Sequence, residues 1–137
     1  MRTLAALSVI LGGAIAAGAA IAHHSFSAEF DSEKPIELTG HVTKVDWTNP
    51  HVWFYINVRD AATGEVTNWG AEMGPPHLLQ RQGWRRESLE IGTEVSITGF
   101  LARNGTPRVN ARAVTLTETG GRPGQTLDAS SSISQGN

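Results

Sequence analysis

VWFYINVR, residues 52–59, carries the strongest strand signal in the sequence. Every even position of this stretch is apolar, and alternation with a period of two is the pattern of a β-strand that buries one face. The β-branched and aromatic residues that dominate it favour strands as well. We therefore expect a strand that buries Phe54 and Ile56 and turns Trp53 and Tyr55 outward.

Four other stretches show the same alternation, and together with the first they predict five strands. They are residues 36–47, 66–73, 94–103 and 108–117. In the first of these, the apolar phase shifts between Val42 and Val45, which predicts a bulge or a sharp bend that Gly40 would permit. A similar shift, to Val114, occurs in the last one.

The segment between the third and fourth strands has a different character. Residues 74–76, GPP, break the strand, residues 77–82 favour a short helix that Gly83 ends, and Trp84 is expected to pack after it. Three strands, a helix and two strands is the element order of the OB fold. We therefore expect an all-β domain, a small five-stranded OB-like barrel with one short helix between strands three and four. Another small antiparallel barrel or a sandwich is the alternative.

The N-terminus has the pattern of an export signal. Met1-Arg2 is positively charged, residues 4–22 carry no charge, and Ala20-Ile21-Ala22 fits a small-x-small cleavage site. We expect residues 1–22 to be a cleaved signal peptide, which places the mature protein in the periplasm or outside the cell without stable membrane insertion. An uncleaved membrane anchor is the alternative. The remaining divisions are an N-terminal arm at residues 23–35, the OB-like domain at residues 36–119 and a disordered tail at residues 120–137.

The composition excludes several classes of function. Hydrophobic residues make up 39% and charged residues 18% of the 137 residues, which is typical of a globular protein. The chain has no cysteine, which excludes disulfides, thiolate metal sites and thiol catalysis. A formal net charge of -2 gives no support to nucleic-acid binding. No Ser-His-Asp spacing, phosphate loop or nucleotide fingerprint is present, so no catalytic residues are assigned.

Several motifs resemble an exported bacterial family known as domain of unknown function 6152. They are AHHSFSAEFD at residues 22–31, LTGHVTKVDWTNPHVWFYINV at 38–58, TNWGAEMG at 67–74, the GW pair at 83–84 and GTEVSITGF at 92–100. The resemblance covers about residues 22–116 and implies export and a small all-β domain. It implies no activity.

Histidines are the candidate metal ligands. If cleavage follows Ala22, His23 offers a free α-amine and an imidazole, and a third nitrogen from His24 or His51, or less favourably His77, would complete a site suited to copper(II). Copper is therefore the candidate cofactor, and a protein without a cofactor is the alternative. The alternatives are a solvent-exposed histidine pair with no metal role, or cleavage after Ala20, which would create a different and more flexible chelate.

Aromatic residues are the second candidate site. Trp53, Tyr55 and Trp69 are candidates for stacking on a small ligand or on a periplasmic protein, peptide or saccharide partner. Alternatively, the N-terminal arm, led by Phe26 and Phe30, covers these rings.

One carboxylate also stands out. Glu72 lies among apolar residues and is the best single candidate for an enzyme. An ion pair with Arg85 or Arg86 is the simpler interpretation of this residue. The sequence therefore favours a binding protein over an enzyme.

Overall fold

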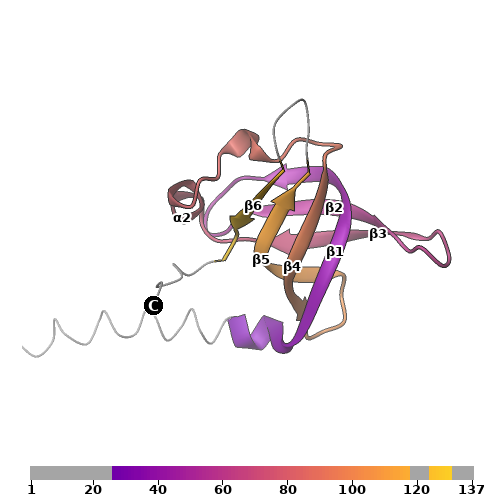
Figure 1. The fold of residues 1–137 in the computed structure, drawn as a ribbon. Coiled ribbons are helices and arrows are strands. Elements are labelled where there is room, and N and C mark those ends of the chain that lie inside the picture. The colour runs from indigo at the N-terminus through magenta and orange to yellow at the C-terminus, as the bar shows by residue number, and fades with distance from the viewer. Residues whose placement is uncertain (1–25, 118–123, 131–137) are drawn as a thin grey trace, which may run out of the picture.

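The computed structural model describes residues 26–117 and 124–130. Within these residues the protein is all-β, with six strands in one sheet and few helices (Figure 1). In chain order the elements are β1 (Phe30–Asp46), β2 (Trp53–Arg59), β3 (Val66–Glu72), α2 (Pro76–Arg81), the 3-10 helix η1 (Arg86–Ser88), β4 (Glu94–Ala102), β5 (Arg108–Leu116) and β6 (Gln125–Asp128). A helical turn at residues 26–29 leads into β1. Over the described residues, no helix is long and apolar enough to cross a membrane.

The strand order in the sheet is β3-β2-β1-β4-β5-β6, and neighbouring strands are antiparallel. β3 also pairs with β5, and this additional pairing is parallel. It aligns Gly70 with Arg108 and Glu72 with Asn110. The first residues of β5 are thereby placed beside the last residues of β3.

The irregularity predicted in the first strand is present. The register of β1 against β2 shifts between Val42 and Lys44, so Thr43 is the extra residue of a bulge. Gly40 has a different role from the one predicted. A Cβ at this position would lie 2.4 Å from the backbone oxygen of Asn57, so glycine is required for the close approach of β1 and β2.

The core is built from the apolar face predicted for residues 52–59. Val52, Phe54 and Ile56 are fully buried. They pack with side chains of β1, β4 and β5 and with Leu79 from α2 in one hydrophobic cluster. Trp84, which follows α2, is also fully buried, as the sequence predicts. The short helix therefore contributes to the core.

The predicted disordered tail is wrong for residues 125–130. Residues 125–128 form β6, which pairs with β5, and the side chain of Leu127 is only 7% exposed. The indole Nε1 of Trp84 donates a hydrogen bond to the backbone oxygen of Asp128 at 2.6 Å. The described part of the chain thus has six strands where five were predicted, because Trp84 and the edge of β5 provide partners that local composition does not reveal.

The predicted boundary between arm and domain at residue 36 is also too late. β1 begins at Phe30, whose side chain is buried. The signal peptide predicted at residues 1–22 lies outside the described residues.

Candidate functional site

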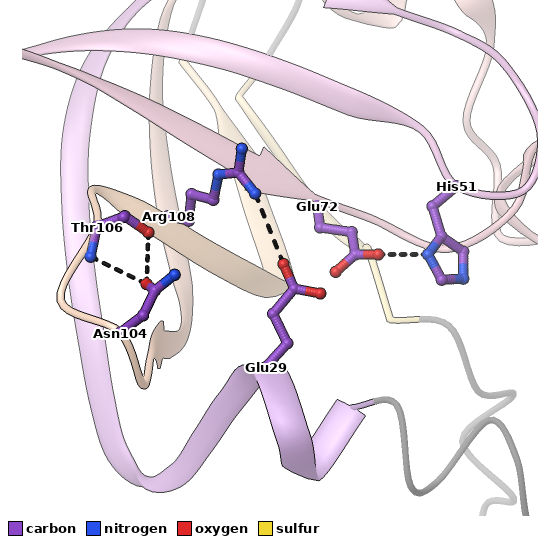
Figure 2. Close-up of polar contacts among 6 residues, drawn as sticks. All are labelled: Glu29, His51, Glu72, Asn104, Thr106 and Arg108. Atoms are coloured by element: carbon purple, nitrogen blue, oxygen red, sulfur yellow. Dashed lines mark hydrogen bonds and ion pairs between the residues drawn. The ribbon is translucent and has the colours of Figure 1, made fainter.

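The site is centred on His51 and Glu72. His51 precedes β2 and Glu72 is the last residue of β3, and the antiparallel pairing of these strands brings the two together. Nδ1 of His51 faces Oε1 of Glu72 as a hydrogen-bond and ion-pair partner (Figure 2). The side chain of His51 is 39% exposed, whereas that of Glu72 is only 10% exposed. A buried carboxylate therefore holds an imidazole at the surface.

The surroundings of Glu72 explain its electrostatics. Burial raises the pKa of Glu72, and the nearby acidic side chain of Glu29 acts in the same direction, whereas His51 and a hydrogen bond from Asn110 oppose the rise. Oδ1 of Asn110 is buried without a hydrogen-bond partner among the described residues. Glu72 thus lies in a poorly solvated site whose strongest compensating partner is His51.

Contact with Glu72 also bears on which ring nitrogen of His51 can bind a ligand. When Nδ1 carries the proton and donates it to the carboxylate, Nε2 keeps a lone pair. Carboxylates hold metal-binding histidines in this way and orient the second nitrogen toward the ion. The arrangement is therefore suited to a metal ligand at Nε2 of His51.

The N-terminal helical turn is fixed beside this pair. Nε of Arg103 donates a hydrogen bond to the backbone oxygen of Ser27 at 2.8 Å. The backbone N–H of Arg103 donates a second hydrogen bond, to the backbone oxygen of Glu29 at 2.9 Å. The guanidinium of Arg103 also lies 3.4 Å from the carboxylate of Asp31. The chain that precedes β1 is thereby held against the turn between β4 and β5.

Glu29 connects the helical turn to the sheet. Its carboxylate lies 3.7 Å from Nη1 of Arg108, and Figure 2 shows it rising toward Glu72. Hydrogen bonds within the turn between β4 and β5 order it locally. Asn104 Oδ1 accepts these bonds from the backbone N–H and the hydroxyl of Thr106. Asn104 and Thr106 therefore support the docking of the arm.

The five histidines have different positions. His23 and His24 lie outside the described residues. His51 is at the site, His77 is exposed on α2, and His41 lies 3.7 Å from the carboxylate of Glu94 on β4. Among residues 26–117 and 124–130, no three side chains of metal-ligating type are close enough together to hold an ion.

The three candidate aromatic residues are only partly brought together. Trp53 and Tyr55 share one face of β2 and line an open groove of about 370 Å³ together with Asp46, Thr48 and Arg108. Trp69 pairs with Ile56 and packs against the core, so it lies on the opposite face of the sheet.

The predicted cover of these rings by arm phenylalanines is not observed. Phe26 stacks on Phe30 and meets Phe100 of β4 edge-on. In the described part of the chain, a cation lies over each of the rings of Trp53 and Tyr55 instead. Arg108 lies 5.5 Å from the ring centre of Trp53, and Lys44 lies 5.3 Å from that of Tyr55.

Sequence reasoning missed several members of the site. Glu72 pairs with His51, so the expected ion pair with Arg85 or Arg86 is wrong. Asn110 and Arg108 were not identified, because the parallel pairing of β3 and β5 that places them here joins segments far apart in the chain. Asn110 lies between Val109 and Ala111 on the polar phase of its strand, together with Arg108, so its sequence position carried no local signal of burial.

The comparisons with known proteins identify a family but no activity. The model of a family of unknown function, DUF6152, matches residues 13–110, which include β1 to β4 and the start of β5. Searches of the curated proteins and of the solved structures each found no match to the chain. The match covers most of the sequence, and the chain belongs to the DUF6152 family.

Proposed function

We propose that the protein is an exported copper-binding protein of the periplasm or the cell exterior, with a site formed by His51 and the N-terminal histidines. In this proposal the signal peptide is removed after Ala22, so that His23 becomes the first residue. Its α-amine and imidazole bind copper together with Nε2 of His51, and His24 is the competing source of the third nitrogen. The function is binding rather than catalysis.

The observation that carries the proposal is the contact of His51 Nδ1 with Glu72. Because Glu72 is buried and cannot move freely, it fixes the ring of His51 with Nε2 directed away from the carboxylate. Outer carboxylates of this kind raise the basicity of a ligating histidine. Desolvation of a buried carboxylate is costly, and the pairing with His51 offsets part of that cost.

The docked arm supports the participation of His23. Six positions separate His23 from Glu29, and an extended chain of this length reaches at most about 20 Å. Glu29 is close enough to Glu72 to affect its pKa. The arm is therefore anchored within a few residues of the point at which His23 would meet His51.

The donor set favours copper. Three nitrogen donors in one plane suit copper(II), which also binds such ligands more tightly than the other divalent ions of its row. An unperturbed α-amine has a pKa near 8, so copper must displace a proton from it. Affinity is therefore expected to rise with pH through the neutral range.

We also propose that the sheet closes into a five-stranded OB-like barrel. The supporting observation is the ring of pairings that runs from β1 through β2, β3, β5 and β4 back to β1. Closure of this kind would leave β6 as an addition to the edge at β5. It would also explain why the site lies where β3 and β5 meet.

Copper titration of the processed protein tests the function. Protein beginning at His23 is titrated with copper(II) and examined by electron paramagnetic resonance, beside a variant with one extra N-terminal alanine. We expect one copper per chain in the processed protein and a changed spectrum in the extended one. His77→Ala is the control, because His77 is exposed on α2 and is not part of the His51–Glu72 pair. Absence of stoichiometric binding, or one spectrum for both forms, contradicts the proposal.

A further inference from the structure

We propose that the groove formed by the end of β1, β2 and the start of β5 is a second site, which binds a neutral saccharide. The groove is lined by Asp46, Thr48, Trp53, Tyr55 and Arg108 and has a volume of about 370 Å³. It involves none of the histidines, so it stands independently of the copper proposal.

A glycine leaves space beside both rings of the groove. Gly70 lies opposite Tyr55 in the pairing of β2 with β3. A Cβ at Gly70 would lie 3.3 Å from Cε1 of Tyr55 and 3.5 Å from Cζ3 of Trp53, so both rings lean over the space that its missing side chain leaves. Arg108 lies over Trp53 and Lys44 lies over Tyr55, so each ring offers its remaining apolar surface to the C–H face of a sugar ring.

The charges around the groove are paired. Nζ of Lys44 lies 2.7 Å from Oδ2 of Asp46, and Arg108 is paired with Glu29 at 3.7 Å. Each cation near the rings therefore has its own counterion. This balance favours an uncharged ligand over a polyanion, which would have to displace both acidic partners.

The polar groups at the rim match a row of hydroxyls. Asp46 accepts hydrogen bonds, the guanidinium of Arg108 donates several in one plane, and the hydroxyl of Thr48 does both. Lys44 engages Oδ2 of Asp46, and the second oxygen of that carboxylate is an acceptor for a ligand hydroxyl. A volume near the lower end of the range for ligand pockets fits a short oligosaccharide segment.

The test is titration with three neutral trisaccharides, namely cellotriose, maltotriose and triacetylchitotriose, at millimolar concentration. The indole N–H signals in ¹H–¹⁵N spectra report on each tryptophan separately. We expect at least one of these sugars to shift the Trp53 signal saturably. Trp53→Ala and Tyr55→Ala should each weaken binding by about tenfold, and backbone amide signals report the binding in Trp53→Ala, which lacks the indole. Trp69→Phe is the matched control, since Trp69 lies on the opposite face, and it should leave the affinity unchanged.

Trigalacturonate and hexathymidylate are the charged probes. Tighter binding of either than of all three neutral sugars would overturn the assigned ligand class. The proposal is also overturned if no neutral sugar moves the Trp53 signal, or if binding persists in both alanine variants. Signal dispersion verifies that each variant is folded. Because the histidines take no part, a protein that fails to bind copper can still pass this test.

Discussion

Nδ1 of His51 and Oε1 of Glu72 are direct partners across the ends of β2 and β3, although 21 positions separate them in the chain. The pair joins an accessible imidazole to a buried carboxylate. Because burial opposes the charge of Glu72, the pair has consequences for stability as well as for the proposed copper binding.

Glu72 should make the stability of the protein fall as the pH rises. Its pKa is raised by burial, so the carboxyl is protonated more readily in the folded protein than in the unfolded chain. Its contribution to stability is therefore full below the unfolded pKa, about 4.3, and is lost as the pH rises through the raised folded value. Glu72→Gln should remove this decline. Urea unfolding at a series of pH values measures it.

The control for this experiment is Glu37→Gln, which removes one negative charge at an exposed position of β1. This control should follow the unaltered protein across the whole pH range. Parallel profiles for the unaltered protein and Glu72→Gln would show that the burial of Glu72 carries no such linkage.

Arg103 should hold the N-terminal helical turn against the sheet. Arg103→Ala removes a hydrogen bond to Ser27 and the ion pair with Asp31. Loss of these partly exposed contacts should weaken docking by about 1 kcal/mol. Hydrogen exchange at the amide of residue 103, which donates to the oxygen of Glu29, should then become roughly fivefold faster. Arg59→Ala, in the distant β2–β3 hairpin, should leave that rate unchanged, and equal rates in all three proteins would refute the assignment.

Gly40 should tolerate no side chain. In Gly40→Ala the new Cβ would meet the backbone oxygen of Asn57 at 2.4 Å, and backbone cannot move aside as a flexible side chain can. The free energy of unfolding should fall by about 1–3 kcal/mol. Gly64→Asn is the comparison, because Gly64 has a φ of 74° with no atom within 4 Å of its Cβ position, and asparagine accepts this conformation. A comparable loss in both variants would contradict the steric explanation.

Trp84, which follows α2, should stabilise the pairing of β6 with the rest of the sheet. Trp84→Phe removes the hydrogen bond to Asp128 and part of a buried side chain, at an expected cost of about 1–3 kcal/mol. Exchange of the β6 amides should accelerate more than that of the β2 amides if residues 125–128 depend on this contact. Uniform acceleration in both strands would indicate a global loss of stability without a special connection to β6.

The strands and the helix could be predicted because each has a local signal. Alternation identified β2, the phase shift between Val42 and Val45 located the bulge at Thr43, and Gly83 correctly marked the end of α2. β6 carries no such signal, since only Leu127 is apolar within its four residues. Its stability comes from pairing with β5 and from Trp84, and neither contact is visible in composition.

The candidate site was predicted less completely for a related reason. His51 and Glu72 were each identified as unusual, but nothing local indicated that they are partners. Their contact depends on the register of β2 against β3, and Asn110 joins them only through the parallel pairing of β3 with β5. These contacts join residues that are far apart in the sequence, so they could not be predicted without the strand pairing.

The most direct test of the central claim is the copper(II) spectrum of His51→Ala in protein that begins at His23. We expect the processed protein to bind one copper through three coordinating nitrogens, and we expect His51→Ala to lose one nitrogen while His77→Ala keeps all three. Electron paramagnetic resonance with ¹⁵N-labelled histidine resolves the two cases. An identical spectrum and affinity for His51→Ala and the unaltered protein would contradict the account.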